Sequence, residues 1–372
     1  MIPIYQPVIK PYINSAIEAL QSEWISNYGK YIELANKKLR EILSVNYSIL
    51  MANGTLATEA LLYSLKFKYP NIQDIYISDH LFISPYNCAL RHFKSENIHI
   101  LPINKETLNL DSSDEILNKI KPNSCLFIVH NVGGITNVEE IGRKRPDLVI
   151  IEDNCEGFLG EYEGKRTGSS KYTLCSAISF YANKNITSGE GGAFFTNDQS
   201  LYDYMVKMYS HGMTSTRYIH DMPAWNFRMT NVQAALLYDQ LCDIETIKNY
   251  KKECFNRYTN LLYQYQTNKN VEVCKPLKIL PNCIGSYWMY VVTIDTVKTY
   301  EQIEKEMKDY GVEIRPMFYS VKYHLHLKEL DTSLINKKDY IQNNKIIIML
   351  PSSPLITLEE QEKVVSSLLQ II

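Results

Sequence analysis

The chain lacks long hydrophobic runs. Its purely aliphatic stretches, such as IIIML at 346–350, are far shorter than the roughly 20 residues that a membrane-spanning helix needs. The first residues, MIPIYQPVIKPYINSAIEAL, contain prolines where a secretory signal has a continuous apolar segment. We therefore expect no membrane span, and we interpret the N-terminus as mature sequence.

An excess of charge of one sign is also lacking. The 39 Lys and Arg residues are nearly balanced by 41 Asp and Glu residues, which gives a net charge of -2. A nucleic-acid-binding protein usually carries a basic surface that displaces counterions from phosphates, often with aromatic residues among the basic ones. No such stretch is present, so we expect no nucleic-acid partner.

The eight cysteines are scattered, with no CxxC pair and no spacing typical of metal ligands. Reduced thiols in a cytoplasmic protein without a bound metal are the simplest interpretation. The cysteines are Cys88, Cys125, Cys155, Cys175, Cys242, Cys254, Cys274 and Cys283.

The composition is that of a folded enzyme-sized protein. With 372 residues, of which 45% are hydrophobic and 22% charged, the chain is long enough for two interlocked lobes. The change of pattern near residue 245 predicts a large domain at 1–244 and a smaller α+β domain at 245–372.

Short apolar runs alternate with helical periods between about residues 45 and 200, which is typical of βαβ units. The runs are apolar at consecutive positions, as expected for strands that are covered on both faces. We therefore predict an α/β fold with a mainly parallel sheet between layers of helices. The predicted strands are 75–78, 98–103, 125–129, 148–153 and 177–182.

Several helices are predicted around these strands. The segment 53–67 carries an apolar stripe and begins after Asn53, a suitable N-cap residue. The segment 229–258 lacks Pro and Gly, which predicts one long helix leading out of the large lobe. In the smaller lobe we expect a strand at 288–294, a helix at 301–311, an extended segment at 312–318 and a closing helix at 358–372.

The segment ISFYANKNITSGEGGAFFTND at 178–198 places Lys184 in a turn before a glycine-rich reversal. Alone, such a lysine is usually a solvated charge, and GEGG is usually a tight turn. The context is IIEDNCEG at 150–157, where an apolar strand ends on Asp153. That residue either caps the next helix or pairs with the protonated nitrogen of a pyridine ring, as pyridoxal phosphate requires.

Two further features suit that cofactor. NGT at 53–55 opens a helix, and the free N–H groups of a helix start favour a phosphate, although an ordinary capped helix looks the same. Phe82 follows a predicted strand, where it either stacks on a pyridine ring or belongs to the core.

The sequence resembles the sugar aminotransferase family named after DegT, DnrJ, EryC and StrS, within the fold-type I pyridoxal-phosphate enzymes. The resemblance extends over nearly the whole chain, and the motifs WISNYGKYI, NFRMTNVQAA, WMY and IRPMF look most similar to perosamine synthases. The matching segments are 23–32, 51–65, 150–169, 179–198, 211–220 and 225–241.

The resemblance implies a role for several residues around the ring. Lys184 would carry pyridoxal 5'-phosphate as a Schiff base and would shuttle a proton during transamination. Asp153 would bind the pyridine nitrogen, Glu156 would lie near the phenolic oxygen, and Phe82 would stack on the ring. Some relatives have His at the Schiff-base position and remove a hydroxyl group, so the lysine favours transamination.

The resemblance also implies a phosphate site and a homodimer. Gly54, Thr55 and Ser179 would bind the phosphate of the cofactor. Asn226, in the motif NFRMT, would reach the phosphate of a neighbouring subunit. The active sites would then be shared between two subunits.

The substrates implied are L-glutamate and a 4-keto-6-deoxy sugar linked to a nucleoside diphosphate. The product would be a 4-amino-4,6-dideoxyhexose of perosamine or viosamine type. The expected substrate-binding residues are Trp24, Ser26, Arg228, Arg315, Tyr319 and Lys322.

Some positions depart from the family pattern. Gly134 stands where a Gln is common, and Tyr319, Ser320 and Lys322 replace the histidines and proline that usually follow IRPMF. Lys322 is either a diphosphate contact or a solvated charge. The alternatives to a 4-aminotransferase are a 3-aminotransferase acting on a 3-keto sugar, a non-catalytic homologue that binds the cofactor, and a lyase acting on an amino acid, for which Arg228 or Arg315 would hold the carboxylate.

Overall fold

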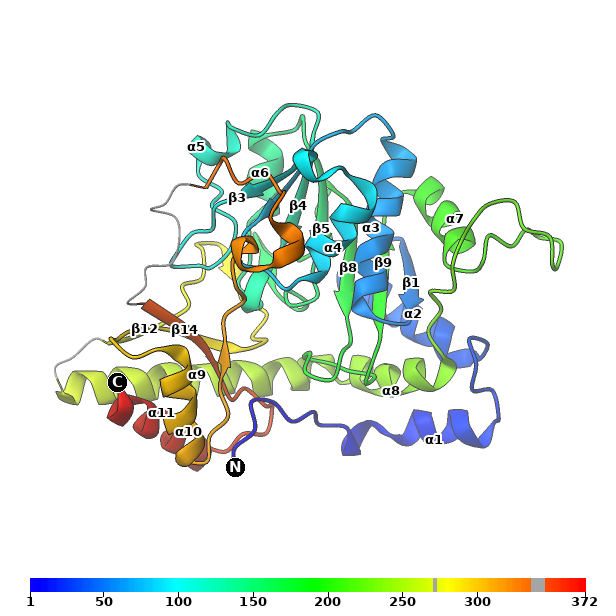
Figure 1. Ribbon diagram of the computed structural model, residues 1–372. Coiled ribbons are helices and arrows are strands. Elements are labelled where there is room, and N and C mark those ends of the chain that lie inside the picture. Colours follow the sequence, from blue (N-terminus) through cyan, green and yellow to red (C-terminus); the bar gives the residue numbers. More distant parts are fainter. Residues whose placement is uncertain (270–272, 336–344) are drawn as a thin grey trace.

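A seven-stranded sheet forms the centre of the computed structural model, which describes residues 1–269, 273–335 and 345–372 (Figure 1). The strands lie in the order β1-β9-β8-β5-β4-β2-β3, and β9 is antiparallel to both of its neighbours while the other pairs are parallel. The strands are β1 (Tyr47–Met51), β2 (Ile75–Ser78), β3 (Ile98–Leu101), β4 (Cys125–Val129), β5 (Val149–Asp153), β8 (Thr173–Ser179) and β9 (Gly192–Thr196).

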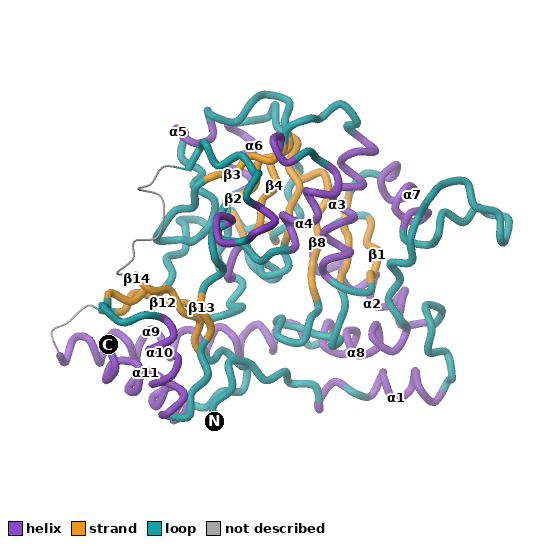
Figure 2. Tube along the Cα trace, in the orientation of Figure 1, coloured by secondary structure: helices purple, strands orange, loops and turns teal. Residues whose placement is uncertain are grey.

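Helices cover both faces of this sheet, as predicted (Figure 2). In β4, Phe127 packs with the helices on one face, while Leu126 and Ile128 pack on the other face. The first face is covered by α3 (Gly54–Lys68), α4 (Ser84–His92) and α7 (Gln199–Met208). The second face is covered by α1 (Asn14–Gln21), α2 (Lys30–Leu43), α5 (Asp114–Leu117), α6 (Val138–Lys144) and α8 (Asn231–Cys242).

Three of the five strands predicted for the large sheet have different bounds in the structure, and β5 differs by only one residue, since it begins at Val149. Strand β3 stops at Leu101, because Pro102 has no N–H group to donate to a neighbouring strand. Strand β8 begins earlier than predicted and ends at Ser179, and the chain then leaves the sheet to form the turn that carries Lys184.

The single helix predicted at 229–258 is wrong. The structure has two helices there, α8 and α9 (Ile244–Lys269), separated at Asp243. The backbone of Asp243 leaves the helical region, and its carboxylate accepts a hydrogen bond of 2.8 Å from the hydroxyl of Tyr12. Helix α8 packs on α1 and α2, whereas α9 packs on the C-terminal elements, so the break lets each helix follow its own partners.

The C-terminal elements form a second, smaller sheet that lies beside the large one (Figure 1). The order is β10-β12-β14-β13 with antiparallel pairing throughout, and a hydrophobic cluster joins this sheet to α9, α10 and α11. The bounds are β10 (Cys274–Pro276), β12 (Tyr290–Asp295), β13 (Arg315–Pro316), β14 (Lys345–Leu350), α10 (Tyr300–Asp309) and α11 (Leu358–Ile371).

Short elements complete the described part of the chain. A small antiparallel sheet contains β11 (Cys283–Ile284), β6 (Glu161–Tyr162) and β7 (Lys165–Arg166). The 3-10 helices are η1 (Lys10–Tyr12), η2 (Ser95–Asn97), η3 (Asn131–Gly133), η4 (Val321–Tyr323) and η5 (Leu325–Leu327).

The N-terminal segment belongs to the C-terminal lobe by its contacts. Ile2 forms a parallel bridge with Val312 and lies in the same hydrophobic cluster as α11. The predicted domain boundary at residue 244 stays a prediction.

Within the described residues, no helix combines the length and the apolar character needed to cross a bilayer.

Candidate active site

Lys184 lies between the two lobes. Its Nζ is 3.6 Å from Glu156 Oε1 and 4.2 Å from the centroid of the Trp288 ring. The side chain of Lys184 is only 12% exposed. The turn after β8, the loop after β5 and the segment before β12 therefore meet at this amine.

The turn that carries Lys184 is held by residues far away in the sequence. The hydroxyl of Tyr5 donates a hydrogen bond of 2.9 Å to the carbonyl oxygen of Lys184. The indole N–H of Trp288 donates one of 2.9 Å to the carbonyl oxygen of Asn183. These contacts fix the backbone from which the lysine side chain extends.

Asp153 ends β5, as predicted, and its carboxylate is held from two sides. Oδ2 accepts a hydrogen bond of 2.9 Å from the hydroxyl of Thr58, and Oδ1 accepts one of 2.8 Å from the N–H of Cys155. Asp153 is 3% exposed. Thr58 was not predicted as a site residue, although it lies four residues after Gly54 and thus on the same side of α3.

Glu156 lies on the other side of Lys184. Its Oε2 accepts a hydrogen bond of 2.8 Å from the N–H of Val132. Burial raises the pKa of the Glu156 carboxyl group, because the charged form is poorly solvated there, and this outweighs the opposing effect of Lys184.

The start of α3 forms a cradle with the end of β8. A Cβ atom on Gly54 would lie 2.6 Å from Ser179 Cβ and 2.7 Å from Ser179 Oγ, so only glycine allows this close approach. Asn53 caps the helix by accepting a hydrogen bond from the N–H of Leu56. The N–H groups of Gly54 and Thr55 belong to the first turn, where no intrahelical acceptor exists, and they suit an anion.

These residues fit pyridoxal phosphate. The cradle of Gly54 and Ser179 suits its phosphate, the oriented carboxylate of Asp153 suits a protonated pyridine nitrogen, and the amine of Lys184 suits its aldehyde. Trp288, whose ring lies against the lysine, was part of the WMY motif but was not predicted as a site residue.

Phe82 follows β2 and is 54% exposed. Its ring packs edge to face against Phe318, with 5.8 Å between the centroids. Residues 318–323, which we call the 318–323 segment, thus lie beside the aromatic residue that we expect to stack on the cofactor. The segment carries the predicted substrate residues Tyr319, which is 49% exposed, and Lys322, whose Nζ lies 5.1 Å from the ring centroid of Tyr323.

Arg315 lies on β13 in the smaller sheet, where its side chain is exposed and its Nη2 is 3.8 Å from Glu313 Oε1. The structure thus brings Arg315 beside Glu313, just before its own strand, rather than into contact with Lys184. Its predicted role toward a diphosphate stays a prediction.

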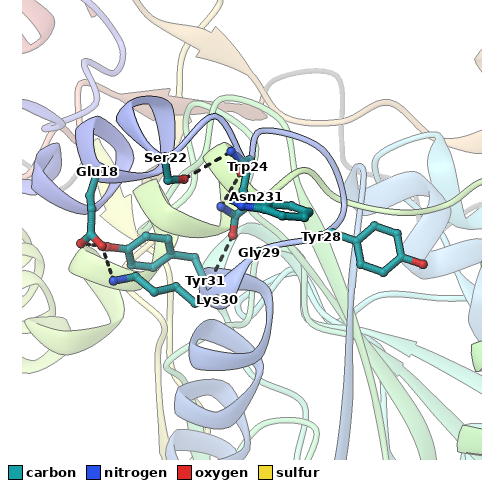
Figure 3. Close-up of a pocket in the computed structure, with 8 residues that line it drawn as sticks. All are labelled: Glu18, Ser22, Trp24, Tyr28, Gly29, Lys30, Tyr31 and Asn231. Atoms are coloured by element: carbon teal, nitrogen blue, oxygen red, sulfur yellow. Dashed lines mark hydrogen bonds and ion pairs between the residues drawn. The ribbon is translucent and has the colours of Figure 1, made fainter.

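Trp24 lies apart from Lys184, in a pocket of ≈ 420 Å³ at the starts of α2 and α8 (Figure 3). The carbonyl oxygen of Trp24 accepts a hydrogen bond of 2.7 Å from the side chain of Asn231, and that of Ser26 accepts one of 2.6 Å from the Asn231 N–H. The aromatic rings of this loop remain open to solvent, since Trp24 is 63% and Tyr28 is 68% exposed.

Asn226 and Arg228 precede α8, in a stretch that lies against the end of β1, where the N–H of Ala52 donates a hydrogen bond of 2.8 Å to the carbonyl oxygen of Phe227. Asn226 Oδ1 accepts a hydrogen bond of 2.9 Å from Nε of Arg228. Met51, at the end of β1, forms a bridge with Arg228. The contacts of Asn226 and Arg228 are thus with each other and with the end of β1, the strand that leads into the Gly54 cradle.

Known sequences similar to this chain were found over most of its length. Residues 8–369 match the model of the DegT/DnrJ/EryC1/StrS aminotransferase family. A GDP-perosamine synthase from Escherichia coli O157:H7 is 32% identical over 328 residues, covering 86% of this chain and 85% of the relative. A GDP-perosamine synthase from Vibrio cholerae is 26% identical over 349 residues, covering 88% and 89%.

Solved structures share the fold. Helicobacter pylori PseC, an aminotransferase involved in the biosynthesis of pseudoaminic acid, has a TM-score of 0.86 at 22% identity and covers 99% of this chain and 98% of its own. An E. coli GDP-4-keto-6-deoxy-D-mannose-3-dehydratase with bound hydrated PLP has a TM-score of 0.88 at 17% identity, with 99% of both chains covered. The predicted fold is thereby confirmed.

Proposed function

Because the chain belongs to the DegT/DnrJ/EryC1/StrS aminotransferase family, whose cofactor is pyridoxal phosphate, we propose that it aminates C4 of a nucleotide-linked 4-keto-6-deoxyhexose with L-glutamate. The observation that carries the proposal is the position of Lys184, beside Glu156 and at the same sheet edge as Asp153. The product is a 4-amino-4,6-dideoxyhexose.

Bound pyridoxal phosphate supplies an electron sink for the cleavage of a C–H bond next to nitrogen. Asp153 keeps the ring nitrogen protonated, since its carboxylate is already oriented by Thr58 and Cys155. Glu156, whose Oε2 is held by the N–H of Val132, would lie near the phenolic oxygen. Lys184 would hold the aldehyde of the cofactor, and its amine, once free, would serve as the base for the proton of the amino donor.

The sugar nucleotide is proposed to bind along the 318–323 segment. Tyr319 is half exposed there, and the cation of Lys322 suits a diphosphate, as does the guanidinium of Arg315. The names of the two curated relatives above make GDP the first nucleotide to test.

We also propose a homodimer with shared active sites. None of the contacts described for Asn226, Arg228, Trp24 and Ser26 involves Lys184 of the same chain, and the rings of Trp24, Tyr28 and Trp225 beside them are exposed. A partner subunit with two-fold symmetry would bring this group to the neighbouring cofactor site.

The direct test is turnover. Purified protein with pyridoxal phosphate and L-glutamate is mixed with 4-keto-6-deoxy sugars linked to GDP, UDP or dTDP, and the products are identified by mass spectrometry and NMR. A 4-amino sugar from one of them is expected. Amination at C3 alone, or no amino sugar from any of the three, would contradict the proposal.

A further inference from the structure

We propose that Asp79 is the residue that positions the 318–323 segment for the sugar nucleotide. It would then affect the transfer of the amino group to the keto sugar, which is the second half-reaction, without affecting the reaction of the cofactor with glutamate, which is the first. The inference rests on the proposed function, because it deepens the role of that segment. Asp79 directly follows β2, three residues before Phe82.

The contact between Asp79 and the segment is direct. Asp79 Oδ1 accepts a hydrogen bond of 2.8 Å from the N–H of Val321. Asp79 is 2% exposed, and Val321 is 1% exposed in the core beneath the segment. A hydrogen bond from a backbone N–H to a buried carboxylate is stronger than one between neutral groups, so it holds Val321 firmly.

Asp79 is itself kept charged. His80 Nδ1 lies 3.2 Å from Asp79 Oδ2. Burial alone would raise the pKa of the Asp79 carboxyl, but His80, the hydroxyl of Ser320 and the N–H of Val321 outweigh it, and the pKa lies below its ordinary value. Ser320 is one of the positions that depart from the family pattern.

The turn that follows β2 has an unusual backbone conformation at His80. His80 adopts a φ of 58°, in the left-handed region that residues with a side chain rarely occupy. Its carbonyl oxygen accepts a hydrogen bond of 3.1 Å from the side chain of Asn131. The turn that presents Asp79 is therefore held in place by the loop after β4.

The segment presents different side chains to its two sides. Val321 faces the core, and Phe318 packs on Phe82. Tyr319 and Lys322 remain on the outer side. With its backbone held at Val321, the segment keeps these outer side chains in one place beside the cofactor-stacking residue.

The test compares Asp79→Ala and the milder Asp79→Asn with wild type. Conversion of the yellow cofactor to its amine form by glutamate measures the first half-reaction, and KM for the keto sugar measures the second. The Ala variant is expected to raise the sugar KM by about tenfold or more, as for loss of a hydrogen bond to a charged group, with the glutamate step within about twofold of wild type. The sugar KM of the Asn variant, which retains an acceptor for the N–H of Val321, should lie between the values of wild type and Asp79→Ala.

A readout independent of turnover is hydrogen exchange at residues 318–323 in the cofactor-free protein. Exchange should be faster in Asp79→Ala than in wild type. The matched control is Asp331→Asn, because Asp331 also pairs with a histidine, His99, but holds a later part of the chain, beyond the 318–323 segment, against β3. We expect the control to leave the sugar KM unchanged.

Three results would overturn the inference: an unchanged sugar KM in Asp79→Ala, equal damage to both half-reactions, or unchanged exchange at Val321. If wild type aminates none of the keto sugars, the proposed function fails instead. In that case the exchange experiment still decides whether Asp79 holds the segment.

Discussion

Replacing Lys251 by Met should change how the stability of the protein depends on pH. Lys251 lies on α9 and is 1% exposed. Its ammonium group donates hydrogen bonds to the carbonyl oxygens of Trp288, at 2.8 Å, and of Ser352, and lies 5.0 Å from the centroid of the Tyr5 ring. Burial without a carboxylate partner in these contacts lowers the pKa of Lys251 to about 8.

The size of the effect follows from that pKa. In an unfolded chain the lysine pKa is 10.5, whereas in the folded state it is about 8. At about 1.4 kcal/mol per pH unit, the charged form of Lys251 therefore lowers the free energy of unfolding by about 3 kcal/mol below pH 8. Between pH 8 and 10.5 the unfolded chain binds more protons than the folded one, so the free energy of unfolding rises with pH. Methionine has no such charge. The difference between wild type and Lys251→Met should therefore grow by about 3 kcal/mol in favour of wild type from pH 8 to 10.5.

The assay is urea unfolding of the cofactor-free protein, followed by tryptophan fluorescence at several pH values. Lys252→Met, a change at the exposed neighbouring position, serves as the control and should give a curve parallel to that of wild type. A Lys251→Met curve that also runs parallel to wild type would refute the reasoning, since it would mean that Lys251 keeps an ordinary pKa in the fold.

Four further outcomes are expected. Lys184→Ala should abolish turnover and the yellow absorbance of bound cofactor, as measured by spectroscopy; retained turnover would contradict its role. Gly54→Ala should weaken cofactor binding by at least about tenfold in a titration, because the added Cβ would lie 2.6 Å from Ser179 Cβ and displace the cradle. Glu156→Gln should gain stability relative to wild type as the pH rises above the ordinary carboxyl pKa of 4.5, in thermal unfolding without cofactor. The reason is that a raised carboxyl pKa means the folded state binds more protons than the unfolded one and loses stability as pH rises. Finally, mixing inactive Lys184→Ala with an inactive Asn226→Ala variant should restore part of the activity if the sites are shared, and no recovery after subunit exchange would argue against sharing.

The large lobe was largely predictable because its strands are local features. Strands β2 and β4 have the predicted bounds, and β5 begins one residue later than predicted, since consecutive apolar residues lead to burial on both faces. The cap at Asn53 was predictable for a similar reason, because an N-cap depends on its own side chain and the N–H groups that follow. The family and the cofactor, both inferred from motifs, are confirmed by the comparisons.

The break of the helix at Asp243 was not predictable, because no Pro or Gly marks it. It depends on Tyr12 and on the different partners of α8 and α9. Thr58 and Trp288 were missed in the same way, since their roles appear only once α3 and the C-terminal lobe are placed beside the large sheet.

The sequence by itself determined that the chain forms a mainly parallel sheet, that Asp153 ends a strand and that Lys184 follows another strand in a glycine-rich turn. Those features depend on neighbouring residues and on the period of apolar positions. The tertiary structure decided what surrounds the lysine: Tyr5 and Trp288 reach its turn across 179 and 105 residues of sequence. Such long-range contacts depend on how whole elements pack, because each side chain involved has an ordinary local sequence and gains its role only from the partner that packing brings to it.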